Sequence, residues 1–446
     1  MATVGTVLLA TTPAPAQQLQ DGWGLPMVPD DEHAACVPIA EGGEPLNKEQ
    51  WAKNFIGLEQ AQQYNRGTFE TGSKKGQPVT IAVIDSGVAS GRVSDVFTGR
   101  LLEGYDWWDA NAKGQCDSSG HGTGVAAIAA GSPMGNPGDP DFIGVAPEAD
   151  ILPIRVFTGG KDEGGDANKS KAVGLAIIDA VDHGADVINV SSVMLESPDL
   201  AAGVAYAMEK NVVIVAASGN ATSHMDDDSI DADKQTFYPA NYSEVIAVGA
   251  HNQEGNWYEG TNFGTNLDLL APGVDVPFPH AAGEYFVDTG TSYAAPFVAG
   301  AAALLKGQYG AEATPAWIQQ RLRDTAIHPP NDFNIYQGHG ILNVGAALTD
   351  PVDEAAIVSD SVSETPSESP STAPIADEDR QAIAGLDPDY DPLRTEKIMA
   401  WASVGIAIVL VTLVLVLKKI IPKGRNRRWR PGTRKADVVP VKAATD

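Results

Sequence analysis

The sequence contains few cysteines and few basic residues for its length. Only two of its 446 residues are cysteines, Cys36 and Cys116, and their wide separation argues against a local metal-binding pair. The chain has 30 lysine and arginine residues against 58 aspartate and glutamate residues, and its net charge of −28 argues against nucleic-acid binding. It also shows no internal repeat and no glycine-rich nucleotide-binding loop.

The scarce basic residues are concentrated at the C-terminus. Residues 418–446 carry a net charge of +8, which leaves −36 on the rest of the chain. The preceding twenty residues, 398–417, contain no charge and are long enough to cross a bilayer as one helix. By the positive-inside rule, the basic flank lies in the cytoplasm. We therefore expect a single-pass protein of the cell membrane with an extracytoplasmic body and a cytoplasmic tail.

Two other segments are expected to lie outside the folded body. Residues 1–16 end in Ala-Pro-Ala, which is typical of a signal-peptidase site, but they lack the basic n-region of a secretory signal. Either the signal is degenerate or the natural start lies upstream of Met1. Residues 350–397 are rich in Ser, Pro and acidic residues, a composition that cannot form a core and predicts a disordered linker.

The body alternates apolar strands with helices. This order predicts an α/β fold with a mostly parallel sheet and helices on both faces. In such sheets, functional residues gather at the carboxyl ends of the strands. The expected strands are 79–84, 151–156, 187–190, 212–216, 245–248 and 267–270, and the expected helices are 122–130, 170–181, one ending at Met208 and one beginning after Ser292.

Ser292 lies in the stretch GTSYAAPFVAG, directly before an alanine-rich segment that is typical of a buried helix. Serine at this place is often a helix N-cap, whose hydroxyl satisfies an unpaired backbone N–H group. The same place suits a nucleophile, because the helix start offers N–H groups and a positive dipole end to a developing negative charge. Taken alone, the stretch favours the cap.

Three further residues lie at the ends of strands or at a helix start. Asp85 ends a strand in VIDSGV, His121 begins a helix in GHGTG, and Asn220 follows a strand in VAASGN. A turn would explain Asp85 or Asn220 alone. The order Asp85, His121, Ser292, however, is the chain order of the subtilisin triad. The motifs DSG, GHGTG and GTSYAAP closely resemble the signatures of subtilisin-like proteases, and residues 338–348 are similar to the final segment of that family.

The resemblance implies a role for each of these residues. Ser292 would be the nucleophile, His121 the general base and acid, and Asp85 the group that orients the imidazole. The Asn220 side chain and the Ser292 N–H group would bind the oxyanion. No cofactor is expected. Structural calcium is frequent in such proteases, but no loop can be assigned to it, and the acidic segment 225–233 is expected to be a solvated loop.

Some positions depart from the general pattern of the family. Val193 replaces a glycine in the strand that pairs with substrate, and we expect it to narrow the groove. Tyr293 and Phe297 stand where Met and His are common, a change expected to alter packing rather than chemistry. The groove is expected to be formed by two short segments, whose members are Ser191, Ser192, Val193, Ala217, Ser218 and Gly219.

The complete layout resembles the mycosins, membrane-anchored proteases of type VII secretion systems. The resemblance implies an N-terminal extension at 17–76 that wraps a protease domain at 77–349. It further implies a serine endopeptidase that cleaves a protein or peptide substrate and associates with the secretion membrane complex. The alternative is a structural subunit of that complex with little proteolytic activity.

The two cysteines provide a separate expectation. Cys36 lies in the extension, and Cys116 lies in NAKGQCDSSG, which is typical of an exposed loop just before His121. An exported location permits oxidation. We expect a disulfide between them that holds the extension against the protease domain, the alternative being two buried free thiols.

Overall fold

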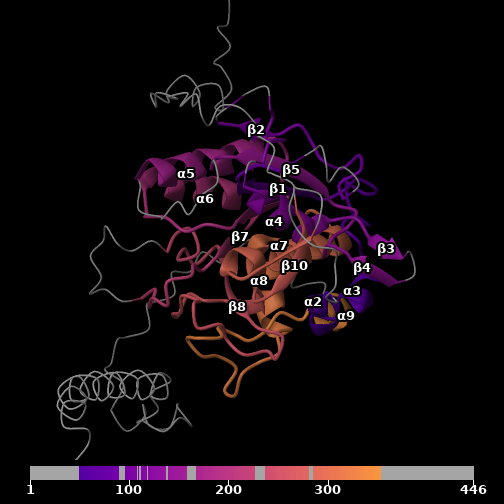
Figure 1. Cartoon of the computed structure of the whole chain (residues 1–446), viewed down its shortest axis with the longest axis vertical. Coiled ribbons are helices and arrows are strands. Elements are labelled where there is room, and N and C mark those ends of the chain that lie inside the picture. Colours follow the sequence, from indigo (N-terminus) through magenta and orange to yellow (C-terminus); the bar gives the residue numbers. More distant parts are fainter. Residues whose placement is uncertain are drawn as a thin grey trace, which may run out of the picture. The chain divides into compact units, whose positions relative to one another are not determined.

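The computed structural model describes residues 50–352 except 90–95, 108, 110–111, 118, 137–138, 158–166, 227–236 and 281–284 (Figure 1). The segments predicted as signal peptide, transmembrane helix and basic tail lie outside the described residues, as does the predicted linker beyond residue 352. Within the described ranges, no helix has the length and hydropathy of a membrane span.

A seven-stranded parallel sheet forms the centre of the described domain (Figure 1), and it confirms the predicted α/β class. In the strand order β2-β5-β1-β6-β7-β8-β9, the next strands of the chain, β2 and β5, lie on one side of β1. The later strands, β6 to β9, lie on the other side, so the order in which strands are added changes direction at β1. Such a reversal leaves a crevice at the carboxyl ends of the strands. The strands are β1 (Thr80–Asp85), β2 (Tyr105–Asp106), β5 (Asp150–Arg155), β6 (Val187–Val190), β7 (Val213–Ala217), β8 (Ile246–His251) and β9 (Leu269–Pro272).

Helices cover both faces of this sheet, as the alternation of strands and helices predicted. On β1, Ile81 and Val83 point into the core beneath α4 (His121–Ala130) and α7 (Thr291–Tyr309). Ala82 and Ile84 point to the other face, into the core beneath α5 (Ala167–Asp182) and α6 (Pro198–Glu209). This separation follows from the two-residue period of a strand.

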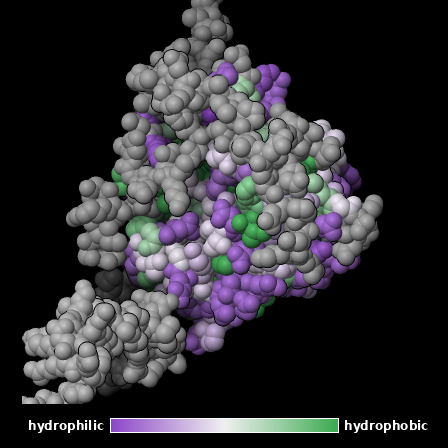
Figure 2. Space-filling view, in the orientation of Figure 1, coloured by the Kyte–Doolittle hydropathy of each residue, from purple (hydrophilic) through white to green (hydrophobic). Residues whose placement is uncertain are grey.

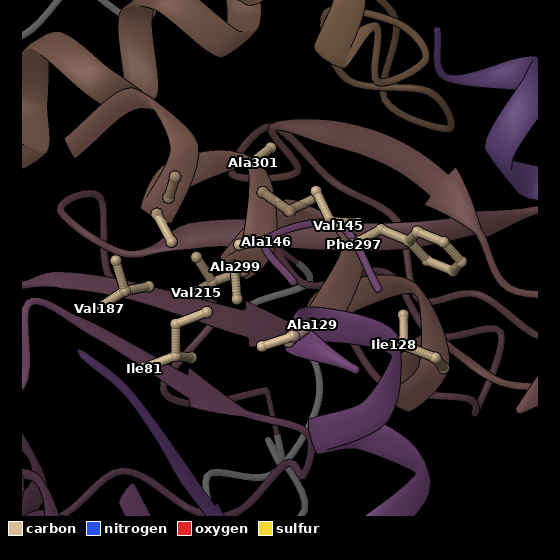
Figure 3. Close-up of a cluster of buried hydrophobic side chains, with 14 of the residues drawn as sticks. Ile81, Ile128, Ala129, Val145, Ala146, Val187, Val215, Phe297, Ala299 and Ala301 are labelled. Carbon is tan, nitrogen blue, oxygen red and sulfur yellow. The ribbon is translucent and has the colours of Figure 1, made fainter. Parts of the chain in front are cut away.

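Figure 3 shows part of the core on the α4 and α7 face. Val187 of β6 and Val215 of β7 belong to the same buried cluster as Ala299 of α7 and Ala129 of α4. The two helices are rich in glycine and alanine, and a Cβ added at Gly300 of α7 would lie 2.8 Å from the Ala129 carbonyl oxygen. Small residues are therefore required where the helix carrying His121 crosses the helix carrying Ser292.

Two short helices precede β1 and belong to the same core. Ile56 and Leu58, at the end of α2 (Trp51–Phe55) and the start of α3 (Leu58–Gln62), are fully buried there. The Gln50 side chain bonds to both the N–H and the carbonyl group of Ile143, at 3.0 and 2.9 Å. The part of the predicted extension that is described thus packs as an integral layer of the domain.

The remaining elements are short. Two antiparallel ribbons pair β3 with β4 and β10 with β11. The strand predicted at 267–270 is shifted in the structure, where β9 begins at Leu269. Leu267 lies before this strand and is buried with Leu270 and Ile341 in a separate cluster. These elements are β3 (Met134–Asn136), β4 (Asp139–Phe142), β10 (Val276–Pro279), β11 (Tyr285–Asp288), α8 (Pro315–Asp324) and α9 (Val344–Thr349).

The surface of the described domain is mainly hydrophilic on the face shown in Figure 2, with apolar residues in small groups. Large hydrophobic side chains are exposed at only four described positions, Tyr64, Val287, Ile327 and Tyr336. Isolated apolar residues of this kind are normal on a soluble surface and indicate no docking site by themselves.

Candidate active site

Asp85 and His121 form a hydrogen-bonded pair at the carboxyl end of β1. Asp85 is the last residue of β1 and is 3% exposed, and His121 is the first residue of α4. The Asp85 Oδ1 atom lies 2.7 Å from His121 Nδ1. A carboxylate at this distance favours the tautomer with the proton on Nδ1 and leaves Nε2 able to accept a proton.

The charges around His121 favour its protonated form. Burial lowers the pKa of the imidazole, but the charge and hydrogen bond of Asp85 raise it, and the charges of Asp117 and Asp288 add to that effect. The net pKa lies above the ordinary value of 6.5. The ring is still 31% exposed, so it remains accessible from solvent.

The two glycines beside His121 are required by close packing. Gly120 has a φ of 79°, in the left-handed region, and a Cβ there would overlap the ring of His280. A Cβ on Gly122 would overlap the Gly87 carbonyl oxygen and lie 3.2 Å from the Asp85 side chain. The GHG stretch therefore lets α4 start directly against the end of β1.

Asp117 is a buried carboxylate that the sequence analysis did not select. Its Oδ1 atom accepts hydrogen bonds from Ser86 Oγ at 3.0 Å and from the Gly120 N–H at 2.8 Å. Its Oδ2 atom accepts from the Thr123 N–H at 2.8 Å and from Thr123 Oγ1 at 2.6 Å. Burial raises the pKa of this carboxyl group, against the effect of these hydrogen bonds.

Asp117 therefore caps α4 from a distance and ties it to the loop after β1. Gly120, the N-cap residue, has no side chain for this purpose. A signal was present in the sequence, because an aspartate shortly before a helix start is typical of capping. This signal was missed because three residues separate Asp117 from His121, whereas an ordinary N-cap residue directly precedes the first residue of the helix.

Ser292 is the second residue of α7 and not its N-cap. The helix begins at Thr291, after an extended Gly290. The Asn220 Oδ1 atom accepts hydrogen bonds from the Thr291 N–H at 2.8 Å and from Thr291 Oγ1 at 3.0 Å. Because Asn220 supplies the cap, the N-cap alternative for Ser292 is wrong, and no described residue forms a hydrogen bond with its hydroxyl group.

Pro296 explains a second contact near the start of α7, the hydrogen bond that the Ser292 carbonyl accepts. It lies in the second turn of α7. Proline has no N–H group, and the carbonyl of Ser292, four residues earlier, lacks its helical donor. Ser191 Oγ donates to that carbonyl at 2.7 Å, and Asn189 Nδ2 donates to Ser191 Oγ at 2.9 Å. The end of β6 thus holds the main chain of Ser292.

Asn220 and Ser292 border the same small space. The position of a Cβ on Gly290 would lie 3.3 Å from Ser292 Oγ and 3.4 Å from Asn220 Nδ2. No described residue accepts a hydrogen bond from Nδ2, whereas Oδ1 is occupied by Thr291. The free hydroxyl group and the free amide donor border the same space, so they can act together on the carbonyl group of a bound substrate.

The loop that carries Asn220 is fixed by a residue that the sequence analysis missed. Asn262 is 1% exposed, and its Nδ2 atom donates to the Ser218 carbonyl at 2.9 Å. Its Oδ1 atom accepts from the N–H groups of Ala221 and Ser223, both at 3.0 Å. No local pattern reveals Asn262, because its contacts lie about forty residues away in the chain.

The predicted groove residues differ in what their side chains can reach. The Ala217 side chain is buried in the core beneath α7, and Ser218 is fully buried with no partner for its hydroxyl. The Ser192 hydroxyl is also buried and unpartnered. The Val193 methyl groups lie 3.2 and 3.3 Å from the position of a Cβ on Gly219, so they cover that glycine.

The predicted residues form two groups that one aromatic ring connects. Asp85 pairs with His121, while Ser292 lies with Asn220 and Ser191. The rings of His121 and Tyr293, the residue after Ser292, have centroids 5.2 Å apart. None of the described hydrogen bonds joins His121 directly to Ser292, and in uncomplexed enzymes such bonds are often long.

The cysteine and metal expectations have different outcomes. Cys116 is 1% exposed, so the expectation of an exposed position is wrong, and it is not a free thiol. Cys36 lies outside the described residues, and its pairing with Cys116 stays a prediction. No group of His, Cys, Asp and Glu in the described ranges could hold a metal ion, and residues 227–233 of the acidic segment lie outside them.

The sequence is similar to those of known serine proteases. Residues 76–356 match the Subtilase family model. Mycosin-4 of Mycobacterium tuberculosis is 30% identical over 441 residues, which cover 91% of this chain and 88% of that protein. A thermophilic serine proteinase of Bacillus sp. is 36% identical over 280 residues, 61% of this chain and 64% of its own length.

A solved structure shows the same relationship. The crystal structure of MycP1 from the ESX-1 type VII secretion system has a TM-score of 0.57 and 28% sequence identity, over 71% of this chain and 90% of that chain. The family match covers the strands and helices that carry Asp85, His121 and Ser292. The chain therefore belongs to the subtilase family of serine endopeptidases, and its similarity to Mycosin-4 over most of its length places it among the mycosins.

Proposed function

We propose that this enzyme hydrolyses peptide bonds with a triad formed by Asp85, His121 and Ser292. The observation that carries the proposal is the 2.7 Å distance between His121 Nδ1 and Asp85 Oδ1, at the carboxyl end of β1. It is supported by the free hydroxyl of Ser292, in the first turn of α7 and next to the residue that contacts the His121 ring.

The residues would act in sequence. His121 Nε2 accepts the proton of Ser292 Oγ while this oxygen attacks the scissile carbonyl carbon, and it later donates that proton to the leaving amine. Asp85 keeps the proton on Nδ1 and stabilises the imidazolium. Asn220 Nδ2 and the Ser292 N–H group, which has no helical acceptor in the first turn, bind the oxyanion.

We further propose that the enzyme is anchored in the membrane and acts with a type VII secretion complex. The support is the relationship to Mycosin-4 and to MycP1 from the ESX-1 system, together with the uncharged span 398–417 and its basic flank. The substrate is a protein or peptide. A purely structural subunit would have no need of the Asp85–His121 pair or of the capped helix start at Ser292.

The proposal is tested with a serine-directed fluorophosphonate and with peptide hydrolysis by the purified full chain. The wild-type protein should be labelled at Ser292 and should cleave peptide, and Ser292→Ala should abolish both. Ser243→Ala is the matched control, because this exposed serine contacts only Glu244 through its side chain. Labelling or hydrolysis that survives in a folded Ser292→Ala protein would contradict the proposed triad.

Co-purification from membranes tests the second part. The wild-type and Ser292→Ala proteins should both recover the same secretion-complex subunits, because the anchor is unchanged. A complex that forms equally with both proteins, without any hydrolysis by the wild type, would instead support the structural alternative.

A further inference from the structure

Tyr293 connects the two halves of the site. It directly follows Ser292 in α7 and is 5% exposed. Its ring stacks on Phe278 of β10, with centroids 4.8 Å apart and an interplanar angle of 18°. The centroid of the His121 ring lies 5.2 Å away, at an interplanar angle of 54°. The residue beside the proposed nucleophile therefore also limits the position of the proposed base.

The Tyr293 ring is anchored through its hydroxyl group. Tyr293 Oη donates a hydrogen bond to Asp288 Oδ2 at 2.7 Å. Asp288 is the last residue of β11, and its Oδ1 atom accepts from the Thr289 N–H at 2.7 Å. Thr289 Oγ1 in turn accepts from the Asp275 N–H at 3.0 Å. Both oxygens of this carboxylate are occupied, so its position is well defined although the residue is exposed.

The other side of the ring stack rests on α4. A Cβ added at Gly124 would lie 2.5 Å from the Phe278 ring, so Phe278 packs directly on the helix one turn after His121. The ribbon β10–β11 consequently contacts the helix that carries His121 and, through Tyr293, the helix that carries Ser292. Any movement of one helix relative to the other must disturb this stack.

We propose that Tyr293 and Asp288 are a positioning pair for the His121 imidazole, an inference that rests on the proposed function. The ring of Tyr293 restricts the rotation of His121, and the carboxylate of Asp288 holds that ring and adds a fixed negative charge near the imidazolium. A side chain without a hydroxyl group at this position could not bind the Asp288 carboxylate. On this proposal, Tyr293 affects the catalytic geometry as well as the packing.

The titratable groups around His121 agree with this assignment. Besides the opposing effect of burial, three carboxylates raise the pKa of the imidazole: Asp85 from β1 most strongly, then Asp117 from the segment before α4, and then Asp288 from β11. Burial lowers the pKa of His280, which follows β10. Burial, and then the bond to Asp288, raise the pKa of Tyr293, so its phenol remains a donor.

Two variants separate the charge from the geometry. Asp288→Asn keeps an oxygen that accepts from Tyr293 but removes the charge. It should lower the pKa of His121, so that more of the imidazole is neutral in acid and the acid limb of kcat/KM moves to lower pH, with plateau kcat retained. Tyr293→Phe keeps the ring and the charge but removes the bond. It should lower plateau kcat roughly two- to tenfold, the loss of one hydrogen bond, with KM unchanged.

The structure offers a matched control pair on the opposite face of the sheet. Tyr206 Oη donates to Asp182 at the same distance, 2.7 Å, between α6 and α5. Tyr206→Phe and Asp182→Asn should leave both kinetic parameters and their pH profile unchanged. They also report how much stability a Tyr–Asp pair of this kind contributes away from the site.

The decisive measurement is an NMR titration of the histidine Cε1 signals in the full chain, with His121 assigned by its loss in His121→Gln. It requires no turnover, so failure of the proposed protease function would not hide the result. The signals of the other six histidines in the described ranges report that each variant is folded. A lowered His121 pKa in Asp288→Asn, with reduced kcat in Tyr293→Phe, is the expected result. A wild-type pKa in the first and wild-type kcat in the second would overturn the positioning pair.

Discussion

Asn220 uses the two ends of its amide group in different ways. Its Oδ1 atom caps α7 through the N–H and hydroxyl groups of Thr291, whereas its Nδ2 atom has no described acceptor and borders the space beside Ser292. Removal of the whole side chain would therefore mix a structural loss with a catalytic one. The two functions can be separated, because aspartate retains an acceptor oxygen and lacks the donor.

Asn220→Asp should keep the cap and lose oxyanion binding. We expect its kcat to fall by at least about 10²–10³, the range for loss of one oxyanion donor, with its melting temperature close to that of the wild type. Asn220→Ala should show a similar loss of kcat and also lose roughly 1 kcal/mol of stability with the cap. Steady-state kinetics and thermal unfolding of both variants check this. Full activity in Asn220→Asp would remove Asn220 from the proposed oxyanion hole.

Sequence patterns identified the elements better than their ends. The continuous apolar run before Asp85 identified β1 as a strand, and the structure shows that it is buried on both faces, because Ile81 and Ala82 point into different cores. The start of α7 was misplaced because its cap comes from Asn220, which lies 71 residues away. No local pattern can show such a partner, whereas the aspartate that caps α4 was at least close in the chain.

The same limit applied to the contacts within the site. The chain order of Asp85, His121 and Ser292 was visible in short motifs, and the structure brings Asp85 and His121 into contact. The pairing of Ser191 with the Ser292 carbonyl depends on an absent proline N–H group and on a second element, β6. Physical contacts that join two elements cannot be read from either element alone.

The C-terminal end of α7 contains a buried lysine, for which we expect a pH-dependent effect on stability. Lys306 is 2% exposed, and its Nζ atom donates to the carbonyls of Asn211 at 2.8 Å and Ala311 at 3.4 Å. Burial lowers the pKa of Lys306 to about 8. The unfolded chain, where lysine has its ordinary pKa of 10.5, therefore binds more protons between these values.

The free energy of unfolding should consequently rise with pH through this window. The contribution of Lys306 is least favourable below pH 8 and improves by about 3 kcal/mol towards pH 10.5. Lys306→Met should lack this rise, so the difference between the two unfolding curves should change with pH in that range and be constant below it. Chemical denaturation at several pH values measures the difference. Parallel curves for the two proteins would show that Lys306 titrates normally.

The distribution of charge over the whole chain bears on its topology. The net charge is +8 after residue 417 and −36 before it, and the uncharged residues 398–417 separate the two parts. A dense basic flank on a span of this length is retained on the cytoplasmic side. The acidic body, with the proposed active site, would then face the outside, where Cys36 and Cys116 can be oxidised.

This arrangement predicts the outcome of protease treatment of intact spheroplasts. A tag at Asp446 should survive on a short membrane-bound fragment, because the tail is protected by the bilayer. A second tag, inserted at Gly72, should be lost, since this exposed turn has a φ of 75° and nothing within 4 Å of the position of a Cβ. Permeabilised cells should lose both tags. Survival of the Gly72 tag together with loss of the Asp446 tag in intact spheroplasts would reverse the topology and place the protease domain in the cytoplasm.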